Sequence, residues 1–198
     1  GMAYGTRNDY KAYAPVQMID IKWKNYDWAR YMNRVDEYRP PMAMVADYEH
    51  SDQKELLYSQ IRDLEKLHIG RVMACPKFVG AIFDIPKDCL IAVSVPTTYA
   101  GFLPDFSHLN GRDVHLLGGR PEKQAELLRK LIGAGANVVS VDGSYHAMKA
   151  GFGQWFDGGR WVKLYGRKES NLELTIASGK NITAYLKRIA AQTQAALF

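Results

Sequence analysis

The stretch VHLLGGRPEKQAELLRKLIGAGANVVSV, residues 114–141, indicates the fold class of the chain. Val114–Leu117 is a short apolar run that predicts a strand, and Pro121 predicts the start of a helix, since proline is favoured at the first helical position. Leucine and isoleucine then recur at helical spacing until glycines end the helix, and Val138–Val141 predicts a second strand. A strand, a helix and a strand joined this closely predict a βαβ unit with parallel strands.

The same alternation of apolar runs and amphipathic stretches extends on both sides of this unit. Further strands are expected at Val16–Trp23, Met42–Ala46, Arg71–Cys75 and Leu90–Val95. Helices are expected at Tyr26–Tyr38, from Ser51 or Asp52 to near Gly70, and at Ile182–Leu197. A long loop is expected over Pro96–Arg112, and a hairpin that pairs Trp161–Tyr165 with Leu172–Ile176.

At least six strands in βα alternation fit either a (β/α) barrel of the TIM type or an open doubly wound sheet. We favour the barrel, because no GxGxxG motif follows the first expected strand, as it would in a dinucleotide-binding doubly wound fold. A full barrel takes about 250 residues. The 198 residues here therefore predict a trimmed or incomplete α/β barrel that ends in a C-terminal helix.

The composition is that of a globular protein, with 47% hydrophobic and 24% charged residues, and we expect a single (β/α) domain over residues 1–198. Two cysteines are too few for a disulfide framework or a zinc motif. We expect no metal or other cofactor, because the chemistry implied by the family resemblance given below requires none. The longest apolar run, Leu90–Val95, is too short to span a bilayer, and no signal segment is visible. These features predict a cytoplasmic protein without a membrane partner.

Positive charge is concentrated near the C-terminus. The net charge is +5, and residues 157–198, a basic C-terminal subregion, hold seven Lys and Arg against three Asp and Glu. This asymmetry favours a polyanionic partner, although it also suits a protein that is merely kept in solution. Aromatic residues between positions 145 and 165 are interleaved with Lys149, Arg160 and Lys163, and they could stack on bases or form a small core under the last helix. They are Tyr145, Phe152, Trp155, Phe156, Trp161 and Tyr165.

Two aspartates stand where expected strands end. Asp142 follows Val138–Val141 directly, and Asp47 follows Met42–Ala46. The carboxyl ends of parallel strands meet at one edge of the sheet, so both carboxylates are candidate catalytic groups that could divide nucleophile, acid and base roles. The alternative for each is a capping or turn role ahead of the next helix.

Other candidate binding residues share this edge. Lys77 follows the third expected strand, and Gly118 and Gly119 follow Leu117, where they would allow a flat or anionic ligand to approach the backbone closely. The glycines would equally serve close packing of the strand against its helix. His115 lies within a strand and is expected to be an interior histidine with its hydrogen bonds satisfied.

Two segments of the chain resemble the tRNA-guanine transglycosylase superfamily, and they are closest to the phage and bacterial relatives that insert 7-deazaguanine bases into DNA. They are VHLLGGRPEKQ at residues 114–124 and NVVSVDGSYHAMK at residues 137–149. The resemblance implies that Asp142 is the nucleophile, that Asp47 is the second catalytic aspartate, and that Gly118 and Gly119 approach the bound base. It extends over about residues 41–156.

The resemblance implies that guanine in a nucleic acid is exchanged for a 7-deazaguanine. Asp142 would attack the anomeric carbon and form a covalent glycosyl carboxylate, while Asp47 would bond the base and help to move its proton. In the tRNA enzymes a run of basic residues follows the nucleophile, and only His146 and Lys149 match it here. The tRNA enzymes also carry a zinc site near the carboxyl end, but no cysteine follows Cys89 in this sequence. DNA is therefore expected rather than tRNA, with a purine or 7-deazapurine base as the second substrate.

Two other kinds of function also fit the sequence. One is a non-catalytic nucleic-acid-binding protein of phage origin that uses the basic aromatic region. The other is a barrel enzyme acting on a phosphosugar, with phosphate held at Gly118, Gly119 and the start of the Pro121 helix.

Overall fold

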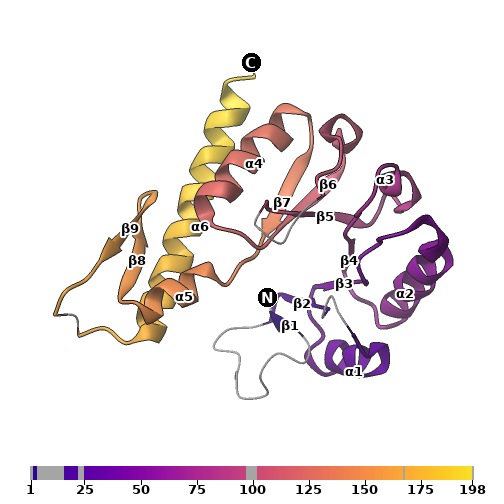
Figure 1. Ribbon diagram of the computed structural model, residues 1–198, viewed down its shortest axis with the longest axis horizontal. Coiled ribbons are helices and arrows are strands. Elements are labelled where there is room, and N and C mark those ends of the chain that lie inside the picture. Colours follow the sequence, from indigo (N-terminus) through magenta and orange to yellow (C-terminus); the bar gives the residue numbers. More distant parts are fainter. Residues whose placement is uncertain (1, 4–15, 22–24, 97–101, 167, 198) are drawn as a thin grey trace.

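The computed structural model describes residues 2–3, 16–21, 25–96, 102–166 and 168–197. Within these residues the main sheet has seven strands, all parallel, in the order in which they occur in the chain (Figure 1). They are β1 Met2–Ala3, β2 Met18–Asp20, β3 Met42–Met44, β4 Arg71–Ala74, β5 Leu90–Ser94, β6 Asp113–Leu117 and β7 Asn137–Val141.

Helices connect most of these strands, and further elements follow the last of them. The α-helices are α1 Trp28–Tyr38, α2 Lys54–Lys66, α3 Ala81–Asp84, α4 Pro121–Gly133, α5 Tyr145–Gly151 and α6 Asn171–Ala195. Two short 3₁₀ helices, η1 Ser51–Gln53 and η2 Phe106–Leu109, precede α2 and β6. An antiparallel hairpin of β8 Gln154–Asp157 and β9 Arg160–Lys163 lies between α5 and α6. The βαβ unit of residues 114–141 is confirmed as β6, α4 and β7.

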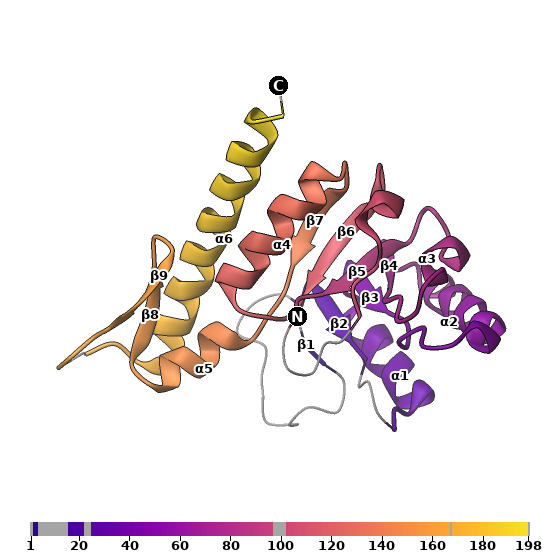
Figure 2. The same cartoon turned by 45° about the horizontal axis from the view of Figure 1, so that its top comes forward.

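The strand order excludes the doubly wound alternative. In a doubly wound sheet the order of the strands reverses at a switch point. Here each strand pairs with its neighbour in the chain from β1 to β7, so the order does not reverse. Side chains also meet across the inside of the sheet: Ser140 Oγ of β7 lies 3.8 Å from Met42 Sδ of β3, although three strands separate them. The sheet is therefore curled into a parallel half-barrel (Figure 2).

A complete TIM barrel is not formed by the described residues. A closed barrel needs eight parallel strands, but after β7 the chain turns into α5, the β8–β9 hairpin and α6. No pairing joins β7 to β1 within the described part of the chain. Helix α6 packs instead along α4, α5 and β8, beside the last part of the arc (Figure 2).

The expected pairing of Trp161–Tyr165 with Leu172–Ile176 is wrong. Leu172–Ile176 belongs to α6, whose start is fixed by a capping box: Ser170 Oγ accepts from the Glu173 amide at 3.2 Å, and Glu173 Oε2 accepts from the Ser170 amide at 2.7 Å. The hairpin forms one segment earlier, between β8 and β9. The last helix therefore begins eleven residues before its expected start at Ile182.

The core lies between the sheet and its helices. Every residue of β5 except Ser94 is buried, which agrees with the continuous apolar run expected for a strand covered on both faces. At the amino end of the strands Arg71 and Asp113 form an ion pair between β4 and β6. Among the described residues no helix combines the length and apolar character needed to cross a bilayer. Part of the expected loop at 96–112 lies outside the described residues.

Candidate active site at the carboxyl end of the sheet

Asp142 is held at the carboxyl end of β7 by backbone contacts to β6. Its amide donates to Leu116 O at 3.1 Å, and its Oδ1 accepts from the Gly118 amide at 2.7 Å. The N-cap of α5 is Ser144, so Asp142 does not have the capping role that the sequence allowed. Burial alone would raise the pKa of Asp142, but hydrogen bonds from His115 and Gly118 outweigh burial and lower the pKa below its usual value. The carboxylate is therefore ionised at neutral pH.

His115 supports this carboxylate from inside the half-barrel. The ring is 1% exposed, and its Nε2 lies 3.3 Å from Asp142 Oδ1, while Nδ1 lies 2.8 Å from Ser140 Oγ. We assign the tautomer with hydrogen on Nε2, because this ring donates to the carboxylate and accepts from the serine hydroxyl. His115 is thus the satisfied interior histidine expected from the sequence, and it also orients the candidate nucleophile.

Gln124 of α4 joins the ends of the two strands. Its Nε2 donates to Gly118 O at 2.8 Å and to Asp142 O at 2.6 Å, and the side chain is 3% exposed. Both amide hydrogens are therefore used on backbone carbonyls of the site. This bond pair fixes the spacing between the Gly118–Gly119 turn and Asp142.

Replacement of Gln124 by leucine is expected to reduce the free energy of unfolding by about 2 kcal/mol, because two part-buried carbonyls lose their donor. Urea denaturation at pH 7 measures the change. Gln192→Leu, the same substitution at an exposed position of α6, is the matched control and should stay within about 0.5 kcal/mol of the unmodified protein. Equal effects of the two substitutions would contradict a joining role for Gln124.

Asp47 forms an ion pair with Lys77 and does not cap the following helix. Its Oδ2 lies 3.2 Å from Lys77 Nζ, which also donates to Ser94 Oγ at 3.1 Å, and the residue at the start of η1 is His50. Burial raises the pKa of Asp47, and Lys77 offsets only part of this effect. Burial alone would lower the pKa of Lys77, but Cys75 and Asp47 raise it, so the lysine stays charged and cannot act as a base toward Ser94.

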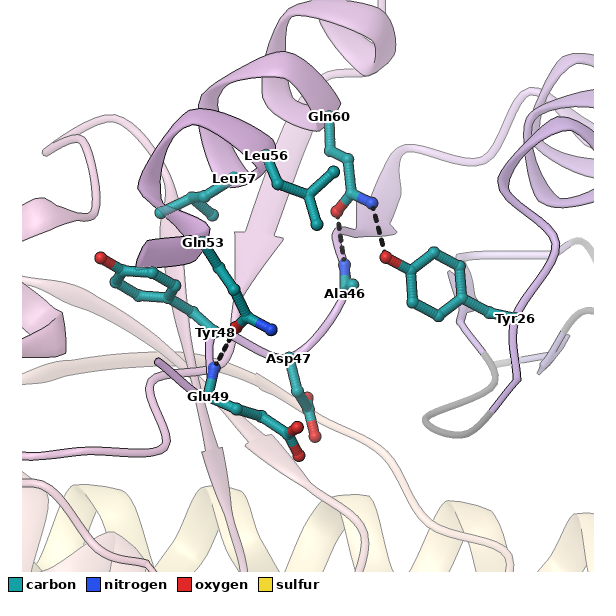
Figure 3. Close-up of a pocket in the computed structure, with 9 residues that line it drawn as sticks. All are labelled: Tyr26, Ala46, Asp47, Tyr48, Glu49, Gln53, Leu56, Leu57 and Gln60. Atoms are coloured by element: carbon teal, nitrogen blue, oxygen red, sulfur yellow. Dashed lines mark hydrogen bonds between the residues drawn. The ribbon is translucent and has the colours of Figure 1, made fainter. Parts of the chain in front are cut away.

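A small cavity opens beside Asp47, between the end of β3 and α2 (Figure 3). The carboxylates of Asp47 and Glu49 point to the same side of it, and Gln60 closes its wall by accepting from the Ala46 amide at 3.0 Å and donating to Tyr26 Oη at 3.2 Å. The volume is about 70 Å³. The cavity therefore has room for a small group of a ligand with hydrogen-bond donors, not for a whole nucleotide.

A third aspartate, Asp20 at the end of β2, belongs to the same edge and was not predicted. Burial, together with the negative charges of Asp142 and Asp47, raises its pKa to about 7. Asp20 thus lies within electrostatic range of both predicted aspartates. A carboxyl group that titrates near pH 7 can both give and accept a proton, as an acid–base catalyst must.

The stability of the protein is expected to depend on pH through Asp20. The folded-state pKa is raised, so the folded chain holds this proton more tightly and stability falls as pH rises from about 4 to 7. Asp20→Asn removes the buried charge and is expected to stabilise the protein by about 2 kcal/mol at pH 8, a value reduced for the partial exposure of the group. Urea denaturation at pH 5 and pH 8 should show a smaller gain at pH 5. A gain of equal size at both pH values would indicate altered packing instead.

A larger cavity of about 230 Å³ adjoins Asp142. It is lined by residues from the Gly119 turn, from α5 and from α6, among them Tyr145, His146 and Thr183. Burial lowers the pKa of His146, so its ring is neutral at pH 7 and can donate or accept a hydrogen bond. Asp142 thus adjoins the cavity that has more room for a substrate.

The predicted site residues fall into two groups along the edge of the sheet. Asp142, Gly118, Gly119 and His146 surround the larger cavity or its turn, whereas Asp47 and Lys77 lie at β3 and β4 beside the smaller one. Asp20 is the group that couples electrostatically to both. Lys149 lies outside both cavities, with its Nζ 5.4 Å from the centre of the Tyr145 ring.

Fold and site together define a parallel α/β half-barrel with three aspartates at the carboxyl edge of its sheet. A family model, DUF6610, described as a family of unknown function, matches residues 1–187, so the chain belongs to this family. No curated protein and no solved structure matches the chain. Within the described residues, no three His, Cys, Asp or Glu side chains are grouped so that they could hold a metal ion.

Proposed function

We propose that the protein exchanges guanine in a nucleic acid for a 7-deazaguanine through a covalent intermediate on Asp142, on a half-barrel that is a trimmed relative of the TIM barrel. The observation that carries the proposal is the state of Asp142: an ionised carboxylate, fixed by Gly118 and His115, that borders a cavity. A carboxylate nucleophile must be ionised and held in place before it can attack.

In the first half of the reaction, a carboxylate oxygen of Asp142 bonds to C1′ of the sugar as the C1′–N9 bond breaks. The electron pair of that bond leaves with the guanine, which takes up a proton as it departs. Asp20, which has a pKa of about 7 and lies within electrostatic range of Asp142, is suited to supply this proton. Asp47 lies beside the smaller cavity, so in this proposal the base extends along the edge of the sheet from Asp142 and donates a hydrogen bond to the Asp47 carboxylate.

In the second half, the incoming deazaguanine attacks C1′ and releases the carboxylate of Asp142. The new base loses its N9 proton to a carboxylate, which restores the acid for the next turnover. The target nucleotide must be unpaired or flipped out of a duplex to reach the cavity. No metal is required in these steps, since each bond formed at C1′ replaces one that breaks, and the protons move between carboxyl groups and bases.

The other predicted residues have supporting roles in this proposal. Gly118 and Gly119 allow the base to approach the backbone, and His146, which lines the same cavity, bonds the ligand. Lys77 holds Asp47 in place through its charge. Lys149 and the basic segment 157–198 face the phosphates of the nucleic acid. DNA remains the expected acceptor.

An exchange assay tests the proposal. The protein is incubated with single-stranded DNA or RNA and radiolabelled guanine, and separately with a 7-deazaguanine, and label in the polymer is counted. Incorporation by the unmodified protein that disappears in Asp142→Asn supports the proposal. Equal incorporation by both proteins would remove Asp142 from the role of nucleophile, and none with either polymer would remove the proposed activity.

A phosphosugar enzyme is the weaker alternative. Its phosphate would need free amides at the Gly118–Gly119 turn, but the Gly118 amide already donates to Asp142 at 2.7 Å. A carboxylate thus occupies the place that the anion would take.

A further inference from the structure

Basic side chains lie against aromatic rings along α5, the β8–β9 hairpin and α6. We call this region the aromatic arm and define it as residues 145–188. Five cation–π contacts involve its aromatic rings, with the cationic group 5.2 to 5.8 Å from the ring centre. They are Lys149 over Tyr145 and over Trp161, Arg120 over Tyr145, Lys163 over Tyr165, and Arg188 over Tyr185. The arm extends away from α1 and α2, at the far side of the molecule (Figure 1).

The arm accounts for the whole net charge of the protein. Residues 145–188 carry eight Lys and Arg against three Asp and Glu, whereas the rest of the chain carries 18 of each. Arg160, Lys163 and Lys180 are exposed. The rest of the chain is balanced in charge, so this excess forms a local positive surface that fits a polyanion.

Two aromatic rings on the arm are open to solvent. Tyr165 is 84% exposed beside Lys163, and Phe152 is 67% exposed at the end of α5. Large apolar side chains this exposed are commonly covered by a partner. Rings with adjacent cations are the groups that stack on unpaired bases while the cations meet the phosphates.

The inner side of the arm is rigid. Phe156 is fully buried between Trp161 and Tyr185, its amide donates to Ser178 Oγ at 3.0 Å, and Asn181 Nδ2 donates to its carbonyl at 2.8 Å. The aromatic residues of this segment therefore divide between a small core under α6 and an exposed set. A fixed scaffold keeps the exposed rings in place before a ligand arrives.

The arm is continuous with the cavity beside Asp142. Tyr145 lines that cavity, and the same ring lies under the cations of Arg120 and Lys149. From Tyr145 the contacts continue through Trp161, and its strand β9 leads to Lys163 and Tyr165. A strand bound along the arm would thus lead toward the candidate nucleophile.

We infer that the aromatic arm binds single-stranded nucleic acid and prefers it to duplex. The faces of bases are free for stacking in a single strand and hidden in a duplex. The delivery of a nucleotide to the cavity rests on the proposed function, but strand binding by the arm does not require base exchange.

Fluorescence anisotropy with a labelled 20-nucleotide DNA, its RNA equivalent and the matching duplex tests this inference. The double variant Lys163→Ala with Tyr165→Ala is expected to bind the single strands at least about 10-fold more weakly, because one stacking ring is lost. The slope of log affinity against log salt should fall in magnitude by about 0.7, as for one lost phosphate contact. Tyr38→Ala with Lys66→Ala, which removes the same residue types from α1 and α2, is the matched control and should bind normally.

The outcomes for strand binding and for base exchange can be told apart. Asp142→Asn should keep full affinity for the strand even though exchange is lost, so a failure of base exchange leaves the binding result intact. Unchanged affinity in the arm variant would overturn the inference. Equal affinity for duplex and single strand would also overturn it, because the arm would then be a general polyanion surface.

Discussion

Asp142→Asn is expected to lower the rate of the proposed base exchange by about 10³-fold or more without unfolding the protein. The amide oxygen of asparagine can still accept from the Gly118 amide, so the turn between β6 and α4 is preserved. An amide cannot form the covalent bond to the sugar, and loss of a nucleophile leaves only the catalysis supplied by binding and positioning. Single-turnover label incorporation measures the rate, and urea denaturation verifies the fold.

The variant His115→Gln tests the role of His115 in orienting the Asp142 carboxylate, as distinct from the role of Asp142 itself. In the proposed reaction His115 acts through Asp142, so this variant should lower the rate less than Asp142→Asn. It should also shift the acidic limb of the pH–rate profile upward, since the carboxylate loses a hydrogen bond that lowers its pKa. An Asp142→Asn protein that retains more than a tenth of the exchange rate would be incompatible with a covalent intermediate on this residue.

Gly119→Ala is expected to reduce the free energy of unfolding by about 4 kcal/mol. A Cβ at this position would lie 2.4 Å from Val95 Cγ1 and 2.5 Å from Val95 Cβ, and Gly119 has a φ of +83°. The side chain of valine is stiff at χ1, so the neighbouring strand end must move to relieve the overlap. Overpacking and left-handed backbone each contribute to the cost. Thermal and urea denaturation measure it.

Gly118→Ala is the matched control for this substitution. Gly118 also has a positive φ, +69°, but a Cβ there would meet nothing within 4 Å. The control should therefore lose only about 1 kcal/mol, the cost of the left-handed conformation. Similar losses for the two variants would show that contact with Val95 is unimportant, and that conformation alone requires the two glycines.

The strands of the sheet and the positions of Asp142 and Asp47 were predictable, because the hydrophobic pattern of the sequence shows where each strand ends. The apolar runs before Asp142 and Asp47 are short and bounded, so the residues that leave the sheet could be located from the sequence. Lys77 was found by the same rule, and the structure places it against Asp47. The strand β6, the helix α4 and the strand β7 follow from one uninterrupted stretch with a proline and glycines at the expected places.

Asp20 could not be identified in this way, since it lies inside the longer run Val16–Trp23 that was expected to be a single strand. Strand β2 ends at Asp20, and the raised pKa depends on burial and on charges from β3 and β7, which only the curl of the sheet brings near. A polar residue inside an apolar run was the available signal. The same limit applies to His115, whose contact with Asp142 depends on the register of β6 and β7.

The C-terminal error has a different cause. Leu172–Ile176 alternates in a way that suits a strand, but the sequence Ser170-Asn-Leu-Glu173 is also a capping box, which commits the segment to a helix. Packing of α6 on α4 and β8 then favours the helix over a second hairpin strand. A local start signal was thus a better guide here than strand propensity.

The order of strands also determines how the carboxyl edge can assemble. Each strand pairs with its neighbour in the chain, so the hydrogen-bonded ladder can grow by short loop closures, whereas the contact between Met42 and Ser140 must join segments 98 residues apart. The contact that curls the sheet therefore carries the larger cost of loop closure. The three aspartates of the carboxyl edge repel one another only in the curled sheet, which brings them within electrostatic range.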